Sequence, residues 1–260
     1  MSQKAARLRN IKISRCIIVA ILIVSTSTYF WQPTGAWWVL DIAFRTWLLF
    51  LCGVMGHEGS HGVLGNSKMA NIWWGRISFI PIAVPNVQFR VTHRYHHSFT
   101  NEEGKDPDML LKMDHWWQFP GRALYMPHYW VQWMNERGLL TKIVFVEWIV
   151  TYIVYAAVFG TIIHFVGWER VVYGLVPAQI LNSFLLWYPF AVKTHEGHHV
   201  GPQEIRSHDY YGHFLYWITL GLSLHRAHNM YPQLGWLQMK PFVQKGPAFT
   251  RHIYEAPASR

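Results

Sequence analysis

Ten of the sixteen histidines in this 260-residue chain fall into four short clusters. The clusters are His57 and His61; His93, His96 and His97; His195, His198 and His199; and His225 and His228, with Asn229 in the last position. On a helix, residues three or four positions apart lie on one face, where two imidazoles can bind one metal ion or two neighbouring ions. Four such clusters predict a metal site. The ligands themselves would carry the chemistry, so no separate catalytic side chain is expected.

The number of ligands favours two metal ions. A zinc ion takes three or four protein ligands, so ten histidines are too many for a single zinc. Neutral imidazole suits iron as well as zinc, so the number of ligands is also compatible with a pair of redox-inert zinc ions. Two irons, each with an open position, could bind and reduce O2 to an oxidant strong enough to take a hydrogen atom from an alkyl chain.

The first cluster also matches a different motif. The segment His57-Glu-Gly-Ser-His61 has the H-E-x-x-H pattern of zinc proteases, in which Glu58 would activate a water molecule. A membrane zinc metalloprotease is therefore an alternative. It would need only one further ligand and would leave the other three clusters unexplained.

Six histidines lie outside the clusters. A lone histidine is more often hydrogen-bonded or interfacial than a metal ligand, and this role is expected for His115, His128, His164, His208, His213 and His252.

The composition indicates a membrane protein. The chain is 51% hydrophobic and only 14% charged, whereas soluble domains have roughly 25% charged residues. The net charge of +9 comes from dispersed basic residues, which favours anionic lipid headgroups over nucleic acid as partners. Cys16 and Cys52 both lie in apolar stretches, so a disulfide scaffold is not indicated.

The apolar stretches predict an all-α integral membrane fold with four transmembrane helices in two hairpins, forming a single domain over residues 1–260. The predicted segments are a basic N-terminus at 1–15, a first hairpin at 16–56, a region with the first two clusters at 57–142, a second hairpin at 143–192, and a region with the last two clusters at 193–260. The positive-inside rule places the N-terminus in the cytoplasm. Both termini and all four clusters then lie there, in a cytoplasmic histidine-rich cap.

Three features of the apolar regions need an explanation. Asp41 and Arg45 lie in the second predicted helix, four residues apart, where they can partly neutralise each other. Glu147 lies in the third helix. The apolar segment at 72–89 is interrupted by prolines and is expected to be interfacial or re-entrant.

The clusters resemble the histidine boxes of the membrane fatty acid desaturase and hydroxylase superfamily, which read HxxxH, HxxHH and HxxHH. The resemblance is closest over His57-Glu-Gly-Ser-His-Gly62, Asn71, Gly75-Arg76, His93-Arg-Tyr-His-His-Ser-Phe-Thr-Asn101, Gly104-Lys-Asp-Pro-Asp108 and His225-Arg-Ala-His-Asn-Met-Tyr-Pro232. With the intervening helices it covers most of the chain. It implies four helices with a cytoplasmic cap and two non-haem irons between the boxes.

The resemblance also implies O2-dependent oxidation of an unactivated C–H bond in a lipid, with fatty acyl desaturation as the expected reaction. Carotenoid ketolases and hydroxylases share the box layout, and fatty acid hydroxylation, terminal desaturation and decarboxylation also stay open. Since no flavin, nicotinamide or haem motif is present, an external donor such as a ferredoxin or a cytochrome with its reductase is expected to supply electrons. The expected location is a bacterial inner membrane. A non-catalytic scaffold or a metal transporter would not need four ligand clusters on one side.

The chain departs from this family pattern at two places. The last box usually ends in two histidines, and Asn229 in its final position could coordinate weakly, act through water, or leave one iron with fewer ligands. After the fourth helix the family often has a single histidine, whereas this chain has the full cluster of His195, His198 and His199. We expect this cluster to supply what the last box lacks.

Carboxylates beside the clusters could orient the ligating imidazoles by accepting their free N–H groups. The candidates are Glu58, Asp106, Asp108 and Glu196. Asp106 and Asp108 fit equally a turn that caps the following segment.

Overall fold

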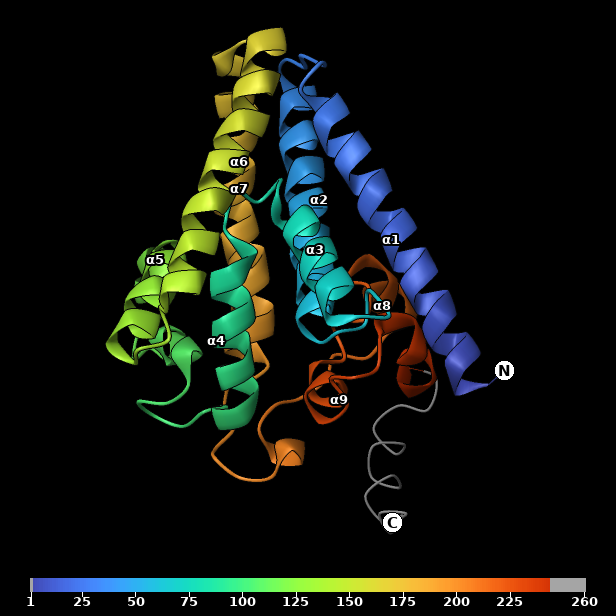
Figure 1. Cartoon of the computed structure of the whole chain (residues 1–260), viewed down its shortest axis with the longest axis vertical. Helices are drawn as coiled ribbons and strands as arrows, with labels where there is room; N and C mark the ends of the chain where they lie inside the picture. The colour runs from blue at the N-terminus through green and yellow to red at the C-terminus, as the bar shows by residue number, and fades with distance from the viewer. Residues whose placement is uncertain (1, 244–260) are drawn as a thin grey trace.

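The computed structural model describes residues 2–243, and in this part of the chain every regular element is a helix (Figure 1). His252 lies outside the described residues. Four helices are long and apolar enough to cross a membrane: α1 (Gln3–Thr28), α2 (Ala36–Ser60), α6 (Lys142–Val166) and α7 (Trp168–Trp187), which continues through a π-helical turn at Tyr188–Lys193. The expected all-α fold with four candidate spans is thereby confirmed.

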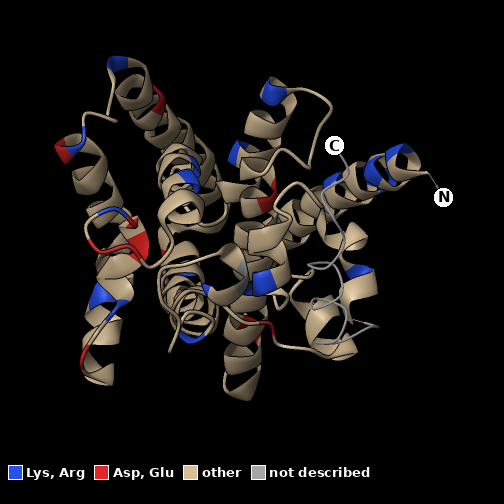
Figure 2. Cartoon of the chain, turned by 90° about the horizontal axis from the view of Figure 1, so that it is seen from below, with Lys and Arg blue, Asp and Glu red and all other residues tan. Residues whose placement is uncertain are grey.

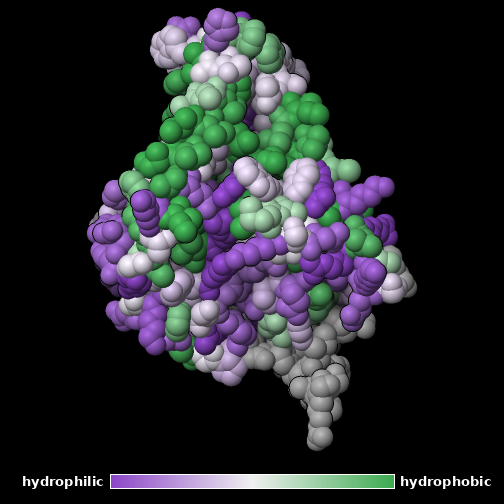
Figure 3. Space-filling view, viewed as in Figure 1, coloured by the Kyte–Doolittle hydropathy of each residue, from purple (hydrophilic) through white to green (hydrophobic). Residues whose placement is uncertain are grey.

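The molecule has an apolar end and a polar end. The link between α1 and α2 and the link between α6 and α7 lie together at the upper end in Figure 1. On the face shown in Figure 3, hydrophobic side chains form a band below a partly hydrophilic upper tip, and mostly hydrophilic side chains cover the lower part. The shorter helices gather toward this polar end: α3 (Lys68–Phe79), α4 (Asn86–Phe99), α5 (Phe119–Glu136), α8 (His213–Ile218) and α9 (His225–Met230).

Prolines divide the segment at 72–89 as its composition predicts. α3 ends at Phe79, and α4 begins after Pro85, which occupies its N-cap position. A proline has no backbone N–H and locks φ near −65°, so a continuous helix through this segment is disfavoured. The break lets α4 begin a new helix, and that helix carries the second histidine cluster.

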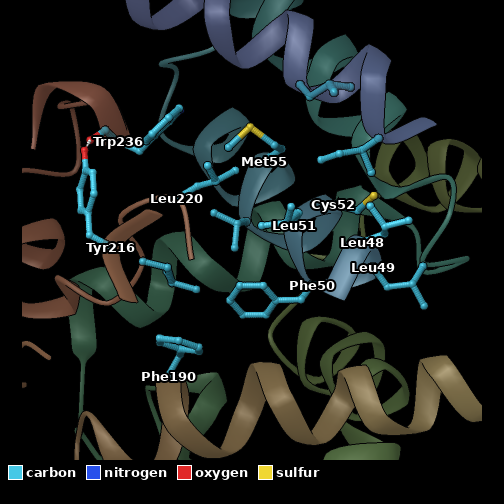
Figure 4. Packing of buried hydrophobic residues seen from close by; sticks show 14 of the residues in the cluster. Leu48, Leu49, Phe50, Leu51, Cys52, Met55, Phe190, Tyr216, Leu220 and Trp236 are labelled. Atoms are coloured by element: carbon cyan, nitrogen blue, oxygen red, sulfur yellow. Dashed lines mark hydrogen bonds between the residues drawn. The ribbon is translucent and has the colours of Figure 1, made fainter. Parts of the chain in front are cut away.

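α2 lies at the centre of the core and comes very close to α3. A Cβ atom on Gly56 would lie 1.9 Å from the Phe79 ring, and one on Gly59 would lie 2.9 Å from the Cα of Gly75. These glycines therefore permit the close approach that positions the end of α2. Earlier on α2, Phe50 and Met55 pack in the core that also contains Phe190, Tyr216 and Trp236, shown in Figure 4.

α1 fastens the loop that follows the first histidine cluster. Arg7 donates to the carbonyl of Gly62, Arg15 to that of Leu64, and the buried Asn10 to that of Val63 at 3.2 Å. The side-chain oxygen of Asn10 also accepts from the backbone N–H of Leu237. The N-terminal polar residues thus hold the regions after the first and last clusters together.

Two acidic side chains within the spans, Asp41 and Glu147, form ion pairs. The Nε atom of Arg45 lies 2.6 Å from the carboxylate of Asp41, which confirms the expected pairing. Glu147 on α6 forms ion pairs with Arg76 on α3 at 2.8 Å and with Arg90 on α4 at 3.0 Å. Glu147 therefore ties the helix that carries the second cluster to the membrane bundle.

Replacing Glu147 by glutamine is expected to lower the free energy of unfolding by about 1–3 kcal/mol, because hydrogen bonds to charged groups contribute about that much. Thermal unfolding in detergent micelles measures the effect. Glu136→Gln is the matched control, because its side chain is 55% exposed and lies 3.6 Å from Arg137; it should change stability by less than about 0.5 kcal/mol. Equal losses of stability in the two variants would contradict a role for Glu147 in holding α3 and α4 to α6.

Candidate metal centre

Eight of the ten clustered histidines meet in two groups, within each of which the potential ligand atoms lie within 4.8 Å of one another. The five-histidine group contains His57, His61, His93, His97 and His228. The three-histidine group contains His96, His195 and His225.

Two helices contribute to both groups, so the groups adjoin each other. α4 presents His93 and His97, four residues apart, to the five-histidine group, and it presents His96 to the three-histidine group. α9 divides in the same way, with His228 in the first group and His225 in the second. Residues three positions apart on a helix point in directions that differ by about 60°, which suits ligands of two neighbouring ions.

The spacing of the ring nitrogens fits a metal ion. The Nε2 atom of His93 lies 2.8 Å from that of His61 and 3.0 Å from that of His97, and the Nε2 atoms of His195 and His225 are 3.0 Å apart. Two nitrogens bound at right angles to one ion, each at about 2.1 Å, would be about 3 Å apart.

Buried ring nitrogens without a hydrogen-bond partner also support a metal site. They include both ring nitrogens of His57 and Nε2 of His228. A buried polar atom normally has a partner, and a metal ion would provide one for these nitrogens. The residues present therefore fit a pair of ions.

Two histidines of the three-histidine group are oriented through one ring nitrogen, Nδ1. His96 donates from Nδ1 to Asp106 at 3.0 Å, and Asp108 lies 3.5 Å from the same nitrogen. His195 donates from Nδ1 to the backbone carbonyl of Arg206 at 2.9 Å. Each contact leaves Nε2 free to face the centre of the group, the arrangement typical of ligating histidines.

Asp106 performs both roles that its sequence position suggests. Besides accepting from His96, it accepts from the backbone N–H groups of Asn101 and Asp108, and it is the N-cap of the short helix Pro107–Leu111. Asp108 accepts from the indole of Trp130 at 3.2 Å. The turn thus holds one carboxylate against His96.

Most of the grouped histidines are held neutral. Burial lowers the pKa of His61, His93, His97, His225 and His228 well below the usual range, and neighbouring imidazoles add to the effect. Burial, followed by the proximity of His96, lowers the pKa of His195 to about 3. A neutral imidazole keeps the lone pair that a metal ion requires.

His96 is the exception among these histidines. Burial disfavours its charged form, but the carboxylates of Asp106 and Asp108 outweigh burial and raise the pKa of His96 to about 9. Burial raises the pKa of Asp108 to about 6. For Asp106 burial is opposed by His96, and the pKa of Asp106 is lowered. A metal ion binding at Nε2 of His96 would therefore displace a proton.

Four other candidates belong to neither group. His198 contacts the carbonyl of Ile205 and Nδ1 of His208, and His199 is exposed. Residues 194–197 form turns rather than a helix, so the spacing of His195 and His199 does not place them on one helical face. Glu58 accepts from the backbone N–H of Trp236, and Glu196 pairs with Lys193 at 2.7 Å.

Asn229 is buried on α9, four residues after His225. Its side-chain nitrogen donates to the hydroxyl of Ser207 at 2.9 Å, and its side-chain oxygen has no hydrogen-bond partner. Arg206 and Ser207, the partners of His195 and Asn229, lie between the third and the last cluster and carry no motif that would reveal these contacts from the sequence.

An apolar cavity adjoins both histidine groups. Its lining includes His57 and His93 from the first group and His96 and His225 from the second, together with apolar residues such as Phe89, Trp130, Leu186 and Phe190. The Phe89 ring stacks on His93, with ring centroids 4.8 Å apart. A second, more polar cavity shares His96, Asp108 and Ala191 with the first. The two cavities thus meet at the three-histidine group.

Comparison with protein families matches residues 31–248 to the family described as Fatty acid desaturase. A 60-residue stretch is 42% identical to the sn-1 acyl-lipid omega-3 desaturase (ferredoxin) of Synechocystis sp., covering 23% of this chain and 16% of that protein. A 96-residue stretch is 31% identical to the sn-1 oleoyl-lipid 12-desaturase of Arthrospira platensis, covering 32% of this chain and 25% of the relative.

A third relative matches over a longer stretch. The Omega-3 fatty acid desaturase fat-1 of Caenorhabditis elegans is 28% identical over 116 residues, which is 42% of this chain and 27% of the relative. The matched stretches thus span between 16% and 27% of the relatives' own lengths.

Proposed function

Because the chain belongs to the fatty acid desaturase family, we propose that it is a membrane oxidoreductase that introduces a double bond into a fatty acyl chain. One observation carries this proposal: two adjoining groups of buried and half-buried histidines each contribute residues to the lining of a single apolar cavity. The histidines suit a pair of redox-active ions, and the cavity suits a hydrocarbon chain.

The proposed cofactor is two iron ions, one in each histidine group. When bound, such a pair supplies the oxidising power, drawn from O2, that breaking an unactivated C–H bond requires. The five-histidine group would hold one ion with its own residues. The three-histidine group has fewer donors, and we assign Asn229 to it as a further ligand, because its side-chain oxygen is buried and without a partner. His198 and His199 lie outside both groups and are left out of the set.

The chain's own side chains would orient the centre and keep it dry. Asp106 holds the ring of His96, and the Arg206 carbonyl holds the ring of His195. Phe89 and Trp130 cover the cavity side of the histidines and limit access of water. An acyl chain lying in the cavity would thus present a methylene to both groups.

An external reductant is part of the proposal. One relative's name specifies ferredoxin as the donor, and we propose a donor of this class here. Figure 2 shows Lys and Arg distributed over several helices at the polar end, where an acidic carrier could dock. The polar end would face the cytoplasm of a bacterial cell, as the basic N-terminus predicts.

The Asp106→Asn variant tests how His96 is oriented. Removing the carboxylate charge is expected to lower the affinity of the three-histidine group for its ion by about 10–100-fold, as for other partners of ligating histidines. Iron retained per chain after dialysis against a graded chelator series measures the loss. Asp114→Asn is the matched control, on an exposed side chain outside both groups. Identical iron retention in both variants would contradict a role for Asp106.

The reaction itself is tested by expression in a host that makes both fatty acyl lipids and β-carotene, followed by mass spectrometry of lipids and pigments. The expected result is acyl chains that have lost two hydrogen atoms, produced by the wild type and by His128→Ala but not by His225→Ala. Oxygen-containing pigment with unchanged acyl lipids would overturn the proposal.

A further inference from the structure

The apolar cavity runs a considerable length along α7. The α7 residues that line it are Gln179, Asn182, Ser183, Leu186 and Trp187, followed by Phe190 and Ala191 in the π-helical turn. The nine residue-to-residue steps from Asn182 to Ala191 correspond to about 14 Å at the rise of an α-helix. His195 of the metal centre follows Ala191 closely, so the polar side chains of α7 lie at the end of the cavity far from the metal centre.

This far end contains a buried amide whose oxygen has no partner. Asn182 is 1% exposed, and its side-chain oxygen makes no hydrogen bond. Its side-chain nitrogen reaches the Gln179 oxygen only at 3.5 Å. An amide within a membrane-spanning helix normally finds a partner, because no water is present there to replace one.

The neighbouring groups define what kind of partner fits. Ser183 donates its hydroxyl hydrogen to the backbone carbonyl of Gln179 at 3.0 Å, which leaves the hydroxyl oxygen able to accept. The far end thus offers the Asn182 and Ser183 oxygens as acceptors and the Gln179 amide nitrogen as a donor. Among the residues that line this cavity there is no lysine or arginine, so a carboxylate would have no counter-ion.

We propose that the cavity accepts a carbon chain carrying a neutral hydroxyl group at the end far from the oxidised carbon, and that Asn182 and Gln179 recognise this hydroxyl. A hydroxyl donates one hydrogen bond and accepts others, which matches the groups present. An unsubstituted chain would leave these amides unpaired. The inference rests on the proposed function, which identifies the cavity as the acyl-chain site. It adds that the site is specific for the end of the chain that lies far from the oxidised carbon.

The test compares binding of two probes to the purified full-length chain in detergent micelles: octadecanoic acid and 18-hydroxyoctadecanoic acid, which differ by one hydroxyl group. Competition against radiolabelled octadecanoic acid gives both dissociation constants. The hydroxylated probe is expected to bind the wild type at least about 10-fold more tightly, since a site built to bind a hydroxyl rejects the analogue that lacks it. Asn182→Leu, of similar size, should abolish the preference, and Gln179→Leu should weaken it.

Asn135→Leu is the matched control, because it makes the same change at an exposed position outside the cavity; it should keep the preference. Equal binding of both probes to the wild type, binding of neither, or an unchanged preference in a folded Asn182→Leu variant would overturn the inference. Because the experiment measures binding and not turnover, failure of this inference can be distinguished from failure of the proposed function. If the protein desaturates acyl lipids but shows no preference for the hydroxylated probe, only this inference is wrong.

Discussion

The His93→Ala variant is expected to lose the ion proposed for the five-histidine group and to lower the proposed desaturase activity by more than about 100-fold. Loss of an outer partner of a ligand already costs about 10–100-fold in metal affinity or activity, so loss of a direct ligand should exceed that range. His93 is the most informative position, because its Nε2 atom lies within 3.0 Å of the corresponding atoms of both His61 and His97.

Iron analysis of the purified protein distinguishes this outcome from general damage. The variant should retain close to one iron per chain where the wild type retains two, since none of the three-histidine residues has been changed. His128→Ala is the matched control, because His128 lies outside both groups. If His93→Ala keeps two irons and wild-type activity, His93 is not a ligand and the five-histidine site is wrongly assigned.

The Gly53→Leu variant is expected to lose activity by about 100-fold while keeping both irons. Gly53 lines the apolar cavity, and even a Cβ atom at this position would lie 3.1 Å from the side chain of Leu186. A leucine would extend further into the space proposed for the acyl chain. A displacement of about 1 Å in a reacting group can cost about 100-fold in rate.

Desaturation of acyl lipids and iron content measure the two parts of this prediction. Gly160→Leu is the matched control, because a Cβ atom on Gly160 of α6 would meet nothing within 4 Å and the position is exposed. Comparison of Gly53→Leu with His93→Ala separates the effect of losing a metal ion from the effect of losing space for the substrate. Full activity of Gly53→Leu would show that the acyl chain lies elsewhere.

The sequence by itself determined the features that depend on local periodicity. The apolar stretches predicted four spans, because helical length and hydrophobicity are properties of consecutive residues. The prolines predicted the break between α3 and α4, and the spacing of Asp41 and Arg45 predicted their ion pair, since residues four apart on a helix are neighbours.

Other properties required the tertiary structure. The histidine spacing indicated metal ligation, but not which histidine belongs to which group. That division depends on how α2, α4 and α9 pack, because three-residue spacing on one helix can serve either one ion or two. The spacing also gave no reason to separate His195 from His198 and His199; turns after the π-helical segment bring only His195 to the three-histidine group.

The partners of charged and polar groups were likewise decided by packing between separate segments of the chain. Glu147 looked like an isolated charge in an apolar helix, yet α3 and α4 supply Arg76 and Arg90. Asn229 meets Ser207, and Asn182 lines the apolar cavity with an unpaired oxygen. Local spacing fixes which side chains share a helix face, whereas the packing of distant helices fixes what each face meets.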